Sequence, residues 1–144
     1  MRFVFLTIAG FAGMEVFSYL VHRFLFHGIL WRVHKTHHKP HKFFLELNDI
    51  FSIIFSLVSI GLMLSKNAKA FPIGFGIALY GLVYFITHDL FTHRRFLSFN
   101  SKNKILLAIR TAHQRHHQSV EKPGLEPFGL FIFDFRKFFR KISS

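Results

Sequence analysis

The sequence predicts an all-α integral membrane protein with three transmembrane helices, or four at most, and a cytosolic cap of histidine-rich helices. Three observations predict this class. Apolar residues make up 51% of the 144 residues and charged residues only 18%, against roughly 25% in soluble domains. The formal net charge is nevertheless +12. Eleven histidines and no cysteine leave imidazole and carboxylate groups as the available metal ligands.

The distribution of charge argues against nucleic acid as a partner. Basic residues of a nucleic-acid-binding protein coat a soluble fold, whereas here they lie between and after long apolar segments. Membrane lipids are the expected surroundings. Because the sequence has no internal repeat and no low-complexity linker, residues 1–144 are expected to form a single membrane-embedded domain.

Three apolar segments approach the length of a membrane-spanning helix: residues 3–21, 50–65 and 71–87. Crossing the hydrocarbon core takes about 20 mostly apolar residues, with a lower limit of about 17. All three segments are short, none contains Lys or Arg, and Glu15 is their only acidic residue. The start resembles a signal peptide. We expect it to be retained, because its apolar stretch leads directly into His22.

The basic residues predict the orientation of these spans. Arg2 precedes the first span, and Lys66 and Lys69 lie between the second and third; the other 16 of the 19 lie between the first two spans or after the third. The positive-inside rule then puts the N-terminus outside and those 16 in the cytoplasm. The expected location is the cytoplasmic (inner) membrane, with the histidines on the cytosolic side.

Residues 128–142 are too short and too charged to span and are expected to lie at the membrane interface. Their Phe side chains would face lipid. The anionic head groups would be met by Arg136, Lys137, Arg140 and Lys141.

Ten of the eleven histidines form a pattern of two H-x4-H pairs and two H-x2-HH motifs. The pairs are His22 with His27 and His88 with His93; the motifs are His34, His37 and His38, and His113, His116 and His117. Spacings of three and four place an H-x2-HH motif on one face of a helix, so we expect its three imidazoles to converge on one locus. In an α-helix the second member of an H-x4-H pair lies about 140° further round. Such a pair contacts one site from two sides or bridges two metals.

All four histidine segments are expected at the same cytoplasmic rim of the membrane. A metal transporter, the alternative from another class, carries its ligands near the bilayer midplane instead. Ten neutral imidazoles exceed the four ligands of a zinc site, which predicts a dinuclear metal site. Imidazole binds iron, copper, nickel and zinc. A pair of non-haem iron ions that activates dioxygen is favoured, because an apolar substrate reaches this rim from the bilayer and electrons reach it from the cytosol.

Five other polar residues lie near the predicted site. Glu15, two turns before His22, is expected to partner a histidine or a basic residue, with a place at the substrate channel or a packing contact as alternatives. Asp89 lies four residues before His93 and would orient its imidazole or pair with a neighbouring arginine. The other three are Asn48, Asp49 and Tyr84.

Asn48 and Asp49 open the second span and are expected to cap it, unless one of them faces the metals. Tyr84 lies four residues before His88 and would line the substrate path or pack within the span. Six basic residues near the histidine motifs are expected to mark the cytoplasmic side of the membrane. The alternative is that they form a docking face for an acidic electron carrier. These residues are Lys35, Lys39, Lys42, Arg94, Arg95 and Arg115.

The histidine motifs lie within longer recognisable stretches. These are residues 15–27, LWRVHKTHHKP at 30–40, NDIF at 48–51, YGLVYFITHDLFTHRRF at 80–96 and AHQRHH at 112–117. Together they resemble the bacterial β-carotene hydroxylases of the fatty-acid hydroxylase superfamily. All ten patterned histidines match that family's ligand positions, whereas His41 does not.

The resemblance implies a non-haem di-iron monooxygenase that uses dioxygen and two external electrons. Its substrate would be a carotenoid drawn from the bilayer, with β-carotene converted via β-cryptoxanthin to zeaxanthin. A ferredoxin-type electron donor with its reductase would supply the electrons. The alternative within the superfamily is a hydroxylase or desaturase of another membrane lipid, sterol or fatty acyl.

Overall fold

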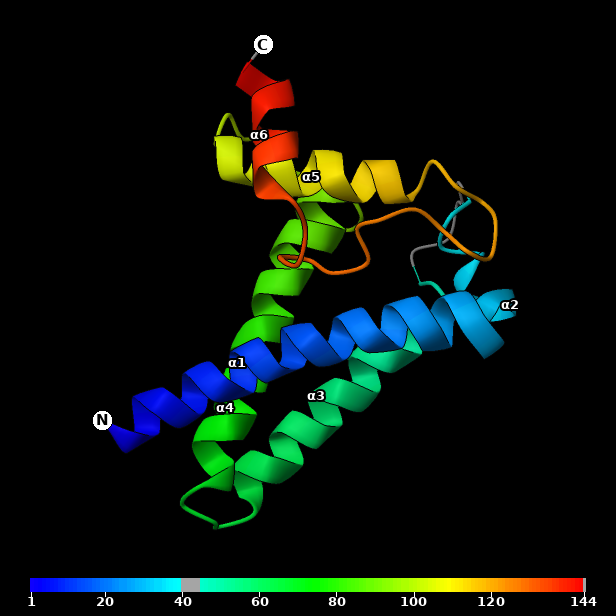
Figure 1. Ribbon diagram of the computed structural model, residues 1–144. Coiled ribbons are helices and arrows are strands. Elements are labelled where there is room, and N and C mark those ends of the chain that lie inside the picture. The colour runs from blue at the N-terminus through cyan, green and yellow to red at the C-terminus, as the bar shows by residue number, and fades with distance from the viewer. Residues whose placement is uncertain (40–44, 144) are drawn as a thin grey trace.

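The computed structural model describes residues 1–39 and 45–143, and its regular elements are all helical (Figure 1). The prediction of an all-α fold is confirmed for these residues. Two long helices each consist of an α-helix that continues into a π-helical segment: α1 (Arg2–Leu20) into η1 (Val21–Ile29), and α4 (Ala70–Tyr84) into η2 (Phe85–Thr92). The remaining helices are α2 (Trp31–His34), α3 (Asp49–Leu64), α5 (Lys104–His116) and α6 (Phe135–Ser143).

Two of the three expected spans are helices long and apolar enough to cross a membrane. They are Arg2–Ile29, with 28 residues, and Ala70–Thr92, with 23. Both are longer than the apolar runs suggest, because the helix continues through its π-helical segment. The third, α3, has 16 residues and remains below that length. Neither α5 nor α6 is among the apolar helices of the described chain, so the structure gives no support for a fourth span.

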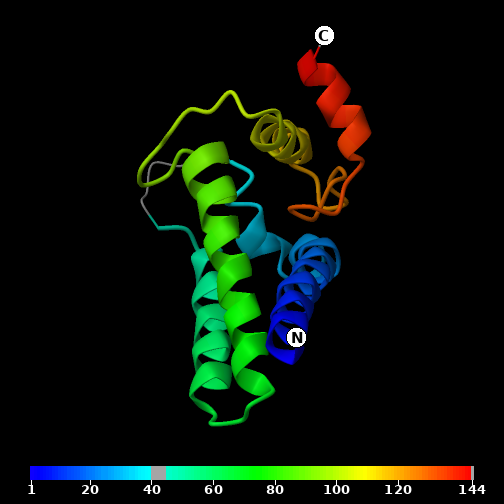
Figure 2. The ribbon, with the colours of Figure 1, turned by 90° about the vertical axis from the view of Figure 1, so that its left-hand side faces the viewer.

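The helices α1, α3 and α4 form a helical stem in which α4 lies between the other two (Figure 2). Glycines let α1 and α4 approach backbone to backbone: a Cβ added to Gly10 would overlap the Ile73 carbonyl, and one added to Gly76 would overlap the backbone of α1. On the other side of α4, the Ser59 hydroxyl donates to the Gly74 carbonyl at 2.8 Å. Contacts of this kind hold membrane helices together, since lipid is as apolar as their side chains.

The outer faces of the stem are apolar. Phe5 on α1 and Leu57 on α3 are both more than half exposed, and only 11% of the most apolar 18 residues of Arg2–Ile29 are buried. The core helix of a soluble protein would be mostly buried, whereas a large exposed apolar surface is typical of a lipid or protein interface. The N-terminus and the loop between α3 and α4 lie at one end of the stem, and α5 and α6 at the other (Figure 2).

The helices α5 and α6 pack against each other beyond the stem. Asn103 caps α5, its side chain accepting hydrogen bonds from the backbone N–H groups of the first turn, as Asn does at many helix starts. Phe138 of α6 is buried against Ala108 and Ala112 of α5, and Phe128 is also buried. The expectation that the Phe side chains of residues 128–142 all face lipid is therefore wrong, because the protein itself covers some of them.

Candidate metal centre

The ten patterned histidines gather where η1, α2, η2 and α5 meet, at one end of the stem. The first histidine group is His22, His27, His34, His38 and His116, whose ligand atoms all lie within 4.8 Å of one another. The second histidine group contains His37, His93, His113 and His117, which meet the same limit, together with His88. The ring centroid of His88 is 4.5 Å from those of both His93 and His113. His41 lies outside the described residues.

Each H-x2-HH motif is divided between the two groups. His34 and His38 belong to the first group, but His37 between them belongs to the second; the motif on α5 is divided in the same way, with only His116 in the first. The expectation that one motif converges on one locus is therefore wrong. Residues i and i+4 are about 40° apart around a helix, whereas consecutive residues are about 100° apart. One motif thus supplies both groups.

Both members of each H-x4-H pair lie in the same group, because the chain is π-helical there. His22 and His27 lie within η1, and η2 begins before His88 and ends one residue before His93. A π-turn closes with a hydrogen bond from residue i+5 to residue i, and the backbone N–H of His93 donates to the His88 carbonyl at 2.8 Å. Residues five apart are thereby brought to one face, so the 140° separation of an α-helix does not apply. Each pair serves one group rather than bridging both.

Every imidazole of the first group donates its Nδ1 proton to an oxygen. His22, His27, His38 and His116 donate to backbone carbonyls, and His34 donates to a side-chain amide oxygen. The acceptors, in that order, are Phe128 at 2.6 Å, Lys122 at 2.9 Å, Ser119 at 2.9 Å, Leu125 at 2.6 Å and Asn48 at 3.2 Å. Since a carbonyl only accepts, the proton sits on Nδ1 and the Nε2 lone pair is left for another partner.

The Nε2 atoms of the first group point at one another. The His34 Nε2 is 2.9 Å from that of His22 and 3.1 Å from that of His38, and the Nε2 atoms of His27 and His116 are 3.2 Å apart. Lone pairs that face each other repel unless a cation lies between them. Two nitrogens bound at right angles to one metal, each roughly 2.1 Å from it, would be about 3.0 Å apart. These residues therefore fit a metal ion.

Burial keeps the imidazoles of the site neutral. It lowers the pKa of His34 and of His116 to about 3, and that of His38 to about 4. Burial and the adjacent His93 lower the pKa of His37 well below 6.5. Neutral imidazole is the form that binds a metal, so the site is ready to do so at neutral pH.

Carboxylates serve as acceptors in the second group. Nδ1 of His37 donates to Glu46 Oε2 at 2.5 Å, and Nδ1 of His88 donates to Asp89 Oδ1 at 3.0 Å. The Nε2 atoms of His93 and His113 are 2.8 Å apart. Among the described residues, Nε2 of His88 is buried and has no hydrogen-bond partner. An acceptor behind Nδ1 and a free Nε2 in front is the arrangement of metal-bound histidines.

Arg95 joins the carboxylates behind the second group. Its guanidinium lies 2.5 Å from Asp49, 3.2 Å from Asp89 and 3.6 Å from Glu46. Burial alone would lower the pKa of Arg95, but these three carboxylates raise it above its ordinary value. Asp89 therefore pairs with an arginine, as one of the two alternatives predicted, and it orients His88 rather than His93.

Asn48 and Asp49 begin α3 without capping it as expected. The helix has no side-chain cap at Asn48, whose amide oxygen instead faces His34. Asp49 accepts from the backbone N–H of Glu46 at 2.8 Å in addition to pairing with Arg95. The capping interpretation fails for Asn48 because the nearby imidazole takes its oxygen.

Glu15 is buried in the stem and does not contact a histidine or a basic residue in the described part of the chain. It accepts hydrogen bonds from the Tyr80 hydroxyl at 2.8 Å and from the backbone N–H groups of Phe131 at 2.7 Å and Ile132 at 2.9 Å. Of the predicted roles, the partner of a histidine or basic residue is wrong. Glu15 instead ties α1 to α4 and to the chain just after Phe128, whose carbonyl holds His22.

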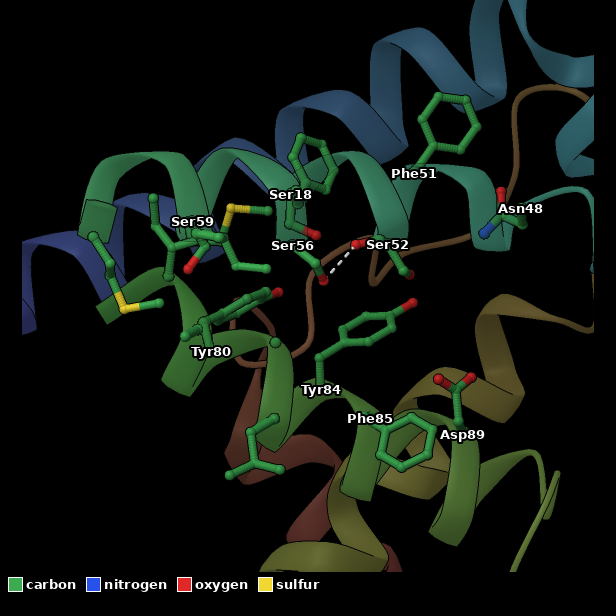
Figure 3. A pocket seen from close by; sticks show the side chains of 18 of the residues that line it. Ser18, Asn48, Phe51, Ser52, Ser56, Ser59, Tyr80, Tyr84, Phe85 and Asp89 are labelled. Atoms are coloured by element: carbon green, nitrogen blue, oxygen red, sulfur yellow. Dashed lines mark hydrogen bonds between the residues drawn. The ribbon is translucent and has the colours of Figure 1, made fainter. Parts of the chain in front are cut away.

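A cavity of about 460 Å³ lies within the stem between α1, α3 and α4. Figure 3 shows side chains of α3 and α4 facing each other across it, with Tyr84 and Asp89 at one end. Ser52 on α3 and Leu82 on α4 line it and are exposed, so it opens sideways between these helices. Its lining is mostly apolar, which suits a hydrophobic ligand.

A second cavity adjoins the large one and is lined by histidines. This smaller cavity, of about 40 Å³, shares Ser18, Phe26, Asn48 and Tyr84 with the large one. The Tyr84 ring stacks on that of His88 at 4.4 Å. Five histidines from both groups line the smaller cavity: His22, His34, His37, His88 and His113.

Sequence reasoning missed Glu46 and the carbonyls of the chain after α5. Glu46 is one of only seven acidic residues and comes two residues before Asn48, which is a signal that could have been used. The carbonyl acceptors left no signal, since every residue has a carbonyl group.

Comparison with known proteins gives the relatives of the chain. Residues 7–139 match the fatty acid hydroxylase family. The chain is 36% identical over 131 residues to the Beta-carotene hydroxylase of Pseudescherichia vulneris, and 35% identical over 131 residues to that of Pantoea ananas; each match covers 88% of this chain and 73% of the relative. It is 37% identical over 135 residues to Beta-carotene 3-hydroxylase 2, chloroplastic, of Arabidopsis thaliana, and spans 44% of that protein. No solved structure matches it.

Proposed function

The chain belongs to the fatty acid hydroxylase family, and on this premise we propose that it is a carotenoid β-ring hydroxylase embedded in a membrane. Its substrate is β-carotene, and its products are β-cryptoxanthin and then zeaxanthin. The observation that carries this proposal is the apolar cavity that opens sideways from the stem and adjoins a smaller cavity lined by histidines of both groups. The names of the bacterial and plant relatives support the choice of substrate.

Two iron ions, one in each histidine group, are the proposed cofactor. The inward-facing Nε2 atoms and the acceptors behind Nδ1 support this assignment. When bound, the irons supply the redox chemistry in which dioxygen, two electrons and two protons convert a ring C–H into C–OH and release one water.

The residues of the chain position the substrate and exclude water. Phe26 and Phe51, with ring centroids 4.4 Å apart, line the cavity beside Asn48 and give it an apolar wall. Tyr84 lies between the cavity and His88, where it limits how far a ring advances. Holding a ring C–H at a fixed place in a dry site favours reaction at one carbon.

The proposed membrane orientation has the N-terminus and the loop between α3 and α4 outside, and the histidines on the cytosolic side. It is supported by the opposite placement of these parts in Figure 2 and by the positive-inside rule. A ferredoxin-type donor with its reductase would then deliver electrons from the cytosol. Lys35 and Lys39 are exposed beside the site and offer positive charge to an acidic donor.

Production of the protein in bacterial cells that make β-carotene tests the proposal, with chromatography of the pigments as the measurement. We expect β-cryptoxanthin and zeaxanthin to appear. Ser56→Phe should slow their formation by roughly tenfold, because a bulky ring would fill part of the cavity; Ser65→Phe, outside the cavity, should not. Unchanged β-carotene in cells whose membranes contain the iron-loaded protein would contradict the proposal and favour another membrane lipid as substrate.

A further inference from the structure

The oxygens that accept hydrogen bonds from the imidazole Nδ1 atoms differ in charge between the two histidine groups. In the first group all five Nδ1 atoms rest on neutral oxygens, four of them backbone carbonyls and one the Asn48 amide. In the second group, His37 and His88 rest on the carboxylates of Glu46 and Asp89. The two groups therefore have the same type of ligand, but the hydrogen-bond acceptors of their Nδ1 atoms differ in charge.

An anionic acceptor changes the imidazole in front of it. A carboxylate that accepts the Nδ1 proton draws positive charge outward and leaves Nε2 a more basic ligand, whereas a neutral carbonyl does so less. The carboxylate also attracts a divalent cation directly, and this attraction is weakly screened where water is scarce. The side chains of Glu46 and Asp89 are only 4% and 12% exposed, so both effects apply.

Arg95 positions these carboxylates without cancelling their charge. Its guanidinium contacts Glu46, Asp49 and Asp89, so three negative charges surround one positive charge. The net charge of these four side chains is negative. Arg95 also fixes Asp89, because the Oδ1 atom that accepts from His88 Nδ1 accepts from the Arg95 guanidinium as well.

We propose that Glu46 and Asp89, positioned by Arg95, make the second histidine group the tighter of the two metal positions, so that it fills first when metal is scarce. This inference rests on the proposed function, which requires two metal ions. Glu46, Asp89 and Arg95 are positioning residues in this account, since they act on the metal through His37 and His88.

Titration of the metal-free, full-length protein in lipid nanodiscs with Co²⁺ tests the inference, because the visible absorption of Co²⁺ reports its ligands. The wild type should bind two ions in two separate steps. Glu46→Gln keeps a hydrogen-bond acceptor for His37 but removes the charge, and should weaken the tighter step by about 10- to 100-fold while leaving the weaker step unchanged.

Two further variants sharpen the test. Asn48→Asp places a carboxylate on His34 of the first group and should tighten the weaker step. Glu121→Gln makes the same chemical change as Glu46→Gln at an exposed position and should change neither step. If Glu46→Gln does not fold, Asp89→Asn replaces it, with the same expectation through His88.

The outcomes separate this inference from the proposed function. Two ions bound with equal affinity, or a Glu46→Gln variant that weakens both steps equally or neither, would overturn the inference and leave the hydroxylase proposal standing. Fewer than two ions per chain in the folded wild type would overturn both.

Discussion

The helical stem and the histidine end of the molecule are held together in different ways. In the stem, α1 and α4 meet at glycines, where only a residue without a side chain fits. A Cβ at Gly10 or Gly76 would overlap the opposite backbone. At the histidine end, the position of each first-group imidazole depends on a hydrogen bond to an oxygen outside its own helix, such as that from His38 to Ser119. The stem is thus specified by a few small residues, and the site by many polar contacts.

This difference teaches where a substitution acts. A change in the stem should alter assembly of the whole protein, whereas a change at the histidine end should alter metal binding in a protein that still inserts. Glu15 is the exception, because it lies in the stem but binds the chain next to Phe128.

Replacing a histidine ligand should abolish hydroxylation without lowering the amount of protein in the membrane. His34→Ala, His38→Ala, His88→Ala and His117→Ala each delete an imidazole from a site in which the described carboxylates are used as acceptors, not spare ligands. We expect hydroxylation to fall by a factor on the order of 100 or more, with normal amounts in the membrane fraction. His41→Ala should keep most activity. An inactive His41→Ala beside two active ligand variants would show the ligand assignment to be wrong.

A bulky residue at the helix crossing should reduce the amount of folded protein. Gly76→Leu forces α1 and α4 apart, because its side chain would meet the α1 backbone, and overpacking of this kind costs about 1 to 3 kcal/mol or more. Gly61→Leu on α3 is the control, since a Cβ there meets nothing within 4 Å. The measurement is the yield and apparent Tm in detergent. Equal yields and Tm values for the two variants would contradict the packing account.

Glu15→Gln should have a smaller effect that reaches both regions. It replaces a carboxylate that accepts three hydrogen bonds, so we expect the free energy of unfolding to fall by about 1 to 3 kcal/mol. Iron content should fall with it, because the chain that places the Phe128 carbonyl on His22 is loosened. Tyr80→Phe removes only one of these bonds and should lower stability alone. Normal iron content in Glu15→Gln would show that the two regions are independent.

The sequence predicts the helices and the clustering of the histidines. It predicts less well how the histidines are divided between the two groups. Apolar runs and the regular spacing of His34 to His38 and His113 to His117 are visible in the chain itself. The π-helical turns at His22 and His88 are not, because they depend on tertiary contacts rather than on local propensity. The 140° separation predicted for an ordinary α-helix is therefore wrong at both H-x4-H pairs.

The hydrogen-bond acceptors of the imidazole Nδ1 atoms are the part of the site that the sequence predicts least well. Asn48 and Asp89 were recognised as relevant, but the imidazole that each contacts follows from the fold and not from spacing: Asp89 meets the adjacent His88 instead of His93. The segment after α5 supplies backbone carbonyls to four histidines. Since any sequence offers carbonyls, only the folded path of the chain shows which of them are used.

The most direct test of the account is the iron content of the purified, reconstituted protein, measured as the ratio of iron to chain by elemental analysis. Two histidine groups with inward-facing Nε2 atoms predict a ratio of two in protein that hydroxylates β-carotene. A ratio of one or less in fully active protein would contradict the account, because one of the two groups would then have no metal to bind.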